Sequence, residues 1–139
     1  MAWKKRLLVI AAVLLLFLGD YLYWTAPISL GKQLPVKVWG KAQLWYYDDG
    51  LIDSTEIQVT EEDFGTIAAA LENTRVTRRP RFQTMSQPWF YLVMQRPDGA
   101  LVILTIVENG DIAVDPGTDR KQYYDGGGEL YQQLQAYVQ

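Results

Sequence analysis

The residues in this sequence that could carry acid–base chemistry are its carboxylates. They flank two predicted turns, with Asp48, Asp49 and Asp53 at the first and Glu108 and Asp111 at the second. Two converging carboxylates, one of them with a raised pKa, would provide the chemistry of a hydrolase. Turns also favour Asp because its side chain hydrogen-bonds the nearby backbone. A carboxylate-dependent hydrolase is therefore an alternative hypothesis, and we predict no catalytic residue.

Most other catalytic chemistry is excluded by composition. The chain has no Cys and no His, which removes disulfides, thiol nucleophiles, thiolate metal sites and the commonest general base. Asp115, Asp119 and Asp125 are spaced too widely for a calcium loop. We expect a protein that is not an enzyme, with no metal and no cofactor.

Aromatic side chains form the first candidate binding set. Residues 36–46 alternate as a half-buried strand does, with Val38, Ala42 and Leu44 on one face. The nominally polar face carries Trp39, Trp45 and, just beyond, Tyr47. Large amphipathic rings are favoured at protein interfaces. These three residues form either a patch for a partner or a surface covered by the last helix or the linker.

Basic side chains form the second candidate set. Residues 74–82 contain four arginines, and alternation puts Arg75, Arg79 and Arg81 on one face until Pro80 interrupts it. Such a face could bind a phosphate, an acidic protein surface or lipid headgroups. Charges and Pro also protect an edge strand from aggregation, so a solvated edge strand is the alternative interpretation.

The segment from Leu7 to Trp24 predicts a membrane anchor. It follows Lys4, Lys5 and Arg6, begins with twelve apolar residues and ends in an aromatic run. Eighteen helical residues span about 27 Å, close to the roughly 30 Å hydrocarbon core. The preceding positive charge predicts a cytoplasmic N-terminal side and an extracytoplasmic remainder. A cleaved signal peptide is the alternative, but no small-residue cleavage site follows the apolar run.

Charge disfavours nucleic acid as a partner. The chain has 13 basic and 16 acidic residues. Three of the basic residues and one of the acidic residues precede Thr25, which leaves 10 basic and 15 acidic residues and a net charge of −5 in the remainder. An acidic domain repels phosphate backbones.

Periodicity predicts three parts: an N-terminal stub and anchor over 1–24, a tether over 25–35 and an α+β domain over 36–139. Hydrophobic alternation and turn signals predict strands over 36–46, 54–59, 74–82, 89–95, 101–107 and 112–114, and helices over 60–73 and from 129. Residues 115–128 are expected to form a turn-rich loop. The order β-β-α-β-β-β-β-α predicts a small antiparallel sheet with helices packed on one face.

Several stretches resemble a family of uncharacterised extracytoplasmic domains found in Gram-positive bacteria on short membrane-anchored proteins and lipoproteins. The resemblance covers roughly 36–138 and lies in Tyr46-Tyr47, residues 57–63, 71–74 and 84–88, and the closing stretch 129–138. Members commonly carry a Pro-Tyr-x-Gly-Ile-Tyr-like stretch before the last helix, which residues 123–128 replace here. The resemblance implies location and fold, and it supplies no catalytic residues.

These observations predict a non-enzymatic, membrane-anchored binding or sensing module in the bacterial cell envelope. Its partners would be the membrane, through residues 7–24, and another envelope protein, with no nucleic acid. Besides the hydrolase, an inhibitor-like domain acting on another envelope protein through a loop at 83–88 is an alternative.

Overall fold

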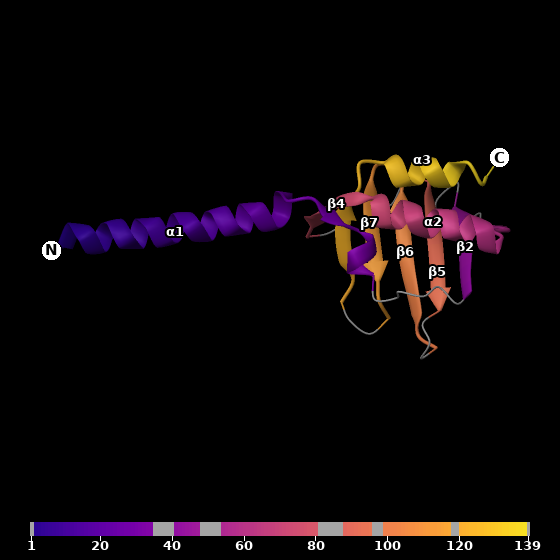
Figure 1. Cartoon of the computed structure of the whole chain (residues 1–139), viewed down its shortest axis with the longest axis horizontal. Helices are drawn as coiled ribbons and strands as arrows, with labels where there is room; N and C mark the ends of the chain where they lie inside the picture. Colours follow the sequence, from indigo (N-terminus) through magenta and orange to yellow (C-terminus); the bar gives the residue numbers. More distant parts are fainter. Residues whose placement is uncertain are drawn as a thin grey trace.

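A long apolar helix stands out from an α+β domain (Figure 1). The computed structural model describes residues 2–34, 41–47, 54–80, 88–95, 99–117 and 120–138. The helix α1 (Ala2–Thr25) has 24 residues, none of them buried. By length and composition it could cross a membrane. Its apolar side chains therefore do not pack into the core of the described domain. Only a membrane or another molecule could shield them from water.

The domain is built on one antiparallel sheet of eight strands in the order β1-β4-β8-β7-β6-β5-β2-β3. The strands are β1 (Ile28–Ser29), β2 (Lys41–Tyr47), β3 (Ser54–Ile57), β4 (Arg75–Arg79), β5 (Trp89–Gln95), β6 (Leu101–Val107), β7 (Asp111–Asp115) and β8 (Gln122–Asp125). The longest ladders join β5 to β2 and to β6. The central strands thus come from the apolar, β-branched segments that alternation predicted.

Two helices pack against the sheet. The helix α2 (Glu61–Asn73) begins with a capping box, in which Thr60 Oγ1 accepts from the Asp63 amide and Asp63 accepts from the Thr60 amide. The helix α3 (Glu129–Gln135) follows the second of two positive-φ glycines. Ile67 of α2 and Leu134 of α3 lie in one core cluster with the inner residues of the sheet. This core lies between the sheet and the two helices, and the other face of the sheet is not covered by α2 or α3.

The α+β class, the antiparallel sheet and the apolar N-terminal helix agree with the sequence prediction, but the element order differs in detail. The sequence analysis missed β1 and β8, because each has only two to four residues and pairs with β4, which is distant in the sequence. It also made 74–82 an edge strand. Instead, β4 lies between β1 and β8, with Arg75 and Val76 pairing to β1 and residues 77–79 to β8.

The segment after α1, expected to be a tether, belongs to the domain over residues 28–34. After β1 a 3-10 helix, η1 (Gly31–Gln33), packs on α2. Leu30 is fully buried and its amide donates to the Thr74 carbonyl at 3.0 Å. Only Ala26 and Pro27 separate α1 from β1. The domain therefore begins immediately at the end of the apolar helix.

Candidate functional site

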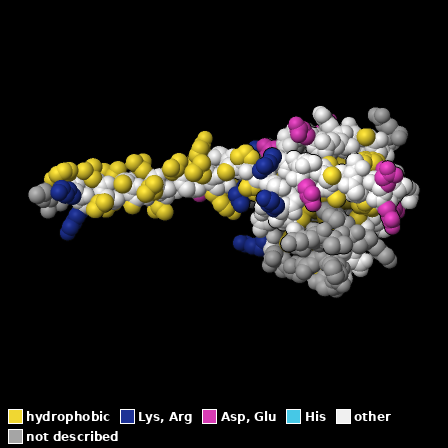
Figure 2. Space-filling view, in the orientation of Figure 1, with side chains coloured by type: hydrophobic (Ala, Val, Ile, Leu, Met, Phe, Trp, Pro, Cys, Tyr) yellow, Lys and Arg dark blue, Asp and Glu magenta, His cyan; other side chains and the backbone are white. Residues whose placement is uncertain are grey.

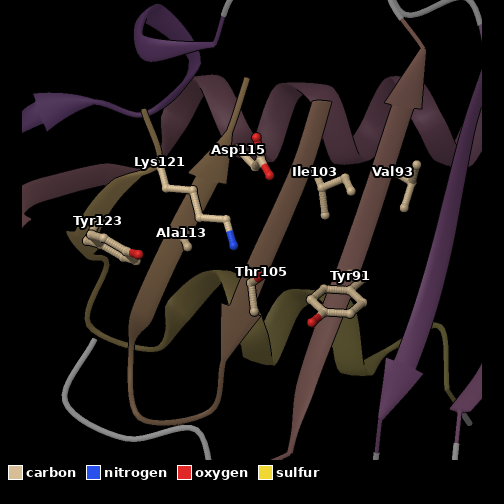
Figure 3. Close-up of a pocket in the computed structure, with 8 residues that line it drawn as sticks. All are labelled: Tyr91, Val93, Ile103, Thr105, Ala113, Asp115, Lys121 and Tyr123. Carbon is tan, nitrogen blue, oxygen red and sulfur yellow. The ribbon is translucent and has the colours of Figure 1, made fainter. Parts of the chain in front are cut away.

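The two faces of the sheet differ in chemistry. Along β5, Phe90, Leu92 and Met94 are buried in the core, and Tyr91 and Val93 between them are only half-buried. Because side chains alternate along a strand, Tyr91 and Val93 lie on the face opposite α2 and α3, which we call the open face. Figure 3 views this face, with both helices behind the sheet.

A hollow of about 300 Å³ lies on the open face. It crosses four strands and is lined by Tyr91, Val93, Ile103, Thr105, Ala113, Asp115, Lys121 and Tyr123 (Figure 3). The strands place these side chains together because cross-strand register pairs Val93 with Ile103, Tyr91 with Thr105 and Thr105 with Ala113. Neighbouring strands alone thus build the hollow.

The hollow has an apolar floor and a polar rim. Val93, Ile103 and Ala113 supply aliphatic surface, and Lys121 reaches over it toward Thr105 (Figure 3). The Asp115 carboxylate also lies on the rim and accepts a hydrogen bond of 3.1 Å from the Gly117 amide. A ligand with an apolar body and a polar or anionic end matches this arrangement.

Tyr91 is the most constrained group at the hollow. Burial and the nearby Tyr47 raise its pKa, while the Trp89 indole and Thr105 hydroxyl lower it slightly. The buried Trp89 Nε1 forms no hydrogen bond of normal geometry within the described chain. It therefore interacts with Tyr91 only through a weak polar contact. The Tyr91 hydroxyl is therefore a hydrogen-bond donor and acceptor near neutral pH, as an ordinary tyrosine is.

An aromatic cluster continues from the hollow toward β2. The rings of Tyr47 and Trp89 stack with centroids 5.4 Å apart, and the Tyr47 and Tyr91 rings meet edge to face at 4.9 Å. Such pairs fix the orientation of large rings and add stability beyond burial. Trp45 and Tyr47 of the predicted aromatic set lie half-buried on this face; Trp39 lies outside the described residues. Sequence analysis missed Trp89 and Tyr91, whose segment it treated only as an apolar strand.

The predicted basic set shares the open face but lies elsewhere on it. Arg75 is exposed, and Arg79 forms an ion pair with Asp125 of β8 at 2.8 Å; Arg81 lies outside the described residues. Five strand steps separate β4 from β2, which is roughly 24 Å at about 4.8 Å per step. The aromatic and basic sets therefore form two separate surfaces.

Two of the carboxylates considered for hydrolysis, Glu108 and Asp111, lie among the described residues. Glu108 is exposed, and Asp111 is buried with its carboxylate accepting from the Asn109 side-chain amide at 3.3 Å. Asp111 stands opposite Asp125 in the sheet, a pairing the sequence analysis did not foresee. Burial would raise the pKa of Asp125, but hydrogen bonds from Arg79 and Gly127 and the charge of Arg79 leave it lowered.

A lowered pKa is the opposite of what a general acid near neutral pH requires, so Asp125 does not suit that role. Asp48, Asp49 and Asp53 lie outside the described residues, as does the proposed inhibitory loop except Pro88. Within the described ranges, no three acidic residues gather where they could hold a metal ion.

A second, more polar groove adjoins the hollow and shares Lys121 and Tyr123 with it. Its lining comes from α1, the end of β4 and the start of β8: Trp24, Arg79, Pro80, Arg120, Lys121, Gln122 and Tyr123. We call it the basic groove. Sequence analysis could not assemble it, because its residues lie up to about a hundred positions apart and β8 was expected to be loop.

Comparison with known proteins finds no matching family model, no similar curated protein and no similar solved structure. Arguments about function therefore rest on the geometry of the open face and the basic groove.

Proposed function

We propose that this protein is a non-enzymatic binding module, anchored in a bacterial membrane by α1, whose extracytoplasmic domain binds another envelope protein through the open face. The resemblance to Gram-positive extracytoplasmic domains agrees with this proposal.

Anchoring is supported by the surface of α1. Leu8, Leu16 and Phe17 are each about seven-tenths exposed, and the helix buries no residue in the domain. Such a continuous apolar surface is stable in hydrocarbon and costly in water. The basic residues Lys4, Lys5 and Arg6 precede it, which favours a cytoplasmic start and places the domain on the opposite side.

Binding rests on one observation, the amphipathic hollow beside the ordered aromatic cluster. Tyr and Trp are enriched among the residues that dominate binding energy at protein interfaces, because they offer large rigid area with a polar tip. Trp89 is itself buried, and its ring contacts hold the half-buried Tyr47 and Tyr91 rings in place before any partner arrives. A preorganised surface loses little side-chain entropy on binding.

The chemistry of the hollow defines the part of the partner that it accepts. The floor of Val93, Ile103 and Ala113 fits an aliphatic or aromatic side chain. Lys121 at the rim then pairs with a neighbouring carboxylate. The proposed partner therefore presents a protruding loop with an apolar side chain next to an acidic one.

A crosslinking experiment on the intact anchored protein tests this proposal. A photoreactive residue replaces half-buried Tyr123 beside the hollow in one variant and exposed Gln132 of α3 in a control variant, and adducts are recovered from native membranes. We expect one stoichiometric adduct from position 123 and none of the same mass from position 132. Equal adducts from both positions would refute a site on the open face.

Substitutions on one strand separate the hollow from its surroundings. Ile103→Glu places a charge on the apolar floor and should reduce the adduct at least tenfold, on the scale of a lost anchor residue. Leu101→Glu is the matched control, since Leu101 lies on the same strand and face but is already half exposed and outside the hollow. If Ile103→Glu does not fold, Tyr91→Ala tests the same surface. Unchanged capture by the folded variants would contradict the proposal.

A further inference from the structure

Basic side chains gather where α1 meets the domain. Figure 2 shows dark blue Lys and Arg side chains around this junction, and most of the acidic side chains visible in that view lie farther along the domain. The basic groove lies here and combines Arg79, Arg120 and Lys121 with Trp24, the penultimate residue of the apolar helix. A domain with a net negative charge thus has a positive end beside its anchor.

The junction is held by specific contacts to the last turn of α1. Arg78 donates from Nη1 to the Tyr23 carbonyl at 3.2 Å, and its guanidinium lies 4.3 Å from the centre of the Tyr23 ring. Thr25 Oγ1 donates to the Tyr21 carbonyl at 2.6 Å. The Thr25 bond lies within α1, whereas Arg78 satisfies a carbonyl that a helix end leaves free, and its charge complements the negative end of the helix dipole. The domain therefore has a defined position relative to the helix axis.

This position sets the depth of the groove, provided that α1 spans the membrane as proposed above. Tyr23 and Trp24 end the apolar segment and suit the interface between hydrocarbon and headgroups. Trp24 also lines the groove, so the groove opens at the level of the lipid phosphates. With only two residues between α1 and β1, the domain cannot move far from that surface.

The charges in the groove favour an anion. Asp125 neutralises Arg79, whereas Arg120 and Lys121 are exposed and have no ion pair within the described chain. Asp20 lies about one turn before Trp24 on α1, and it offsets one of the positive charges. Arg120 and Lys121 together outweigh Asp20 and leave the groove positive. Guanidinium and ammonium groups bind phosphate through charge-assisted hydrogen bonds.

We propose that the basic groove binds the phosphate of an anionic phospholipid headgroup, such as phosphatidylglycerol, in the leaflet where α1 ends. The bound lipid would hold this end of the sheet against the membrane. The hollow on the open face, which shares Lys121 and Tyr123 with the groove, would then be presented to a partner beside the membrane. Free phosphate and an acidic protein segment are the competing anions that the test must separate.

Native mass spectrometry of the full chain tests the proposal. The protein is released from neutral detergent in the presence of phosphatidylglycerol or of phosphatidylcholine with the same acyl chains. We expect retention of one phosphatidylglycerol, at least tenfold preferred over phosphatidylcholine. Retention should be weaker at 0.5 M salt, because the Debye screening length there is only a few ångströms. Equal retention of both lipids would overturn the headgroup site.

Charge-removing variants locate the lipid. Each basic residue near an anionic surface contributes about 1 kcal/mol, so Arg120→Gln/Lys121→Gln should lower retention by about tenfold or more. Lys32→Gln removes one exposed charge outside the groove and should leave retention unchanged, whereas Arg120→Gln alone should lower it several-fold. Equal effects of Lys32→Gln and Arg120→Gln would contradict the proposed location.

Two further experiments distinguish the lipid from other anions and test the anchor by itself. Inorganic phosphate or an acidic peptide that displaces the lipid at equal concentration would refute a lipid-selective site. Flotation of the same protein with pure phosphatidylcholine vesicles in alkaline carbonate tests anchoring alone. A protein that does not float overturns the anchor, and one that floats without headgroup preference overturns only the present inference.

Discussion

The same strands give the sheet two faces with different tasks. Leu44, Leu92 and Leu104, on the face covered by α2 and α3, are fully buried. Tyr91, Val93 and Ile103, one position away on the same strands, are only half-buried and line the hollow. Because side chains alternate along a strand, the residues that stabilise the core lie on one face, and the other face is available for recognition. Substitutions one residue apart should therefore differ greatly in their effect.

The largest difference is expected between neighbouring residues of β5. Leu92→Ala removes a fully buried side chain from the core, and we expect a loss of about 2–5 kcal/mol in the free energy of unfolding. Val93→Ala on the open face should cost less than about 1.5 kcal/mol. Denaturant unfolding of the full chain in detergent measures both. Similar losses from the two substitutions would show that the faces do not differ.

The next effect tests whether the segment after α1 helps to close the covered face. A Cβ atom at Gly31 would lie 2.9 Å from Glu72 Cα of α2, so Gly31→Ala should destabilise the domain by about 1–3 kcal/mol. Gly65→Ala is the control, because its Cβ would meet nothing within 4 Å on α2 and Ala should stabilise a helix by about 0.5–1 kcal/mol. Thermal unfolding measures the stability of both variants. An unchanged stability of Gly31→Ala would mean that residues 28–34 behave as a loose tether.

The smallest effect concerns the ion pair on the open face. The pKa of Asp125 is lowered from 3.8 in the folded protein, so the Arg79–Asp125 pair contributes stability above that value and loses it as pH falls through the folded pKa. Both side chains are about one-third exposed, which limits the contribution to about 0.5–1 kcal/mol. Unfolding free energies of the native chain and Asp125→Asn should differ at neutral pH and converge as the pH falls through the folded pKa of Asp125. A difference that grows on acidification would contradict the assigned sign.

Much of the fold follows from local pattern. The α2 boundaries could be predicted because Thr60 and Asp63 form a capping box and the apolar stripe ends near Leu71. The inner face of β2 could be predicted because Ala42, Leu44 and Tyr46 alternate with polar residues and all pack toward the core. The strand β8 could not be predicted in this way, because its four residues between loops gain their stability from pairing with β4 and β7.

The candidate sites were predicted less completely than the fold. Trp45, Tyr47, Arg75 and Arg79 were singled out by residue type, and they do lie on one sheet face. Their separation by roughly five strand steps, about 24 Å, is set by a strand order that places β8, β7, β6 and β5 between β4 and β2. The hollow and the basic groove lie on and beside those intervening strands.

The sequence by itself determined the apolar helix, the alternating strands, the capped helix α2 and the acidic balance of the domain, since each depends on residues near one another in the chain. Only the tertiary structure decided which residues meet. It paired Tyr91 with Thr105 across β5 and β6, and it brought Trp24, Arg79 and Arg120 to one groove. Such contacts depend on strand order and register, which are selected by the burial of the whole core and not by any single segment.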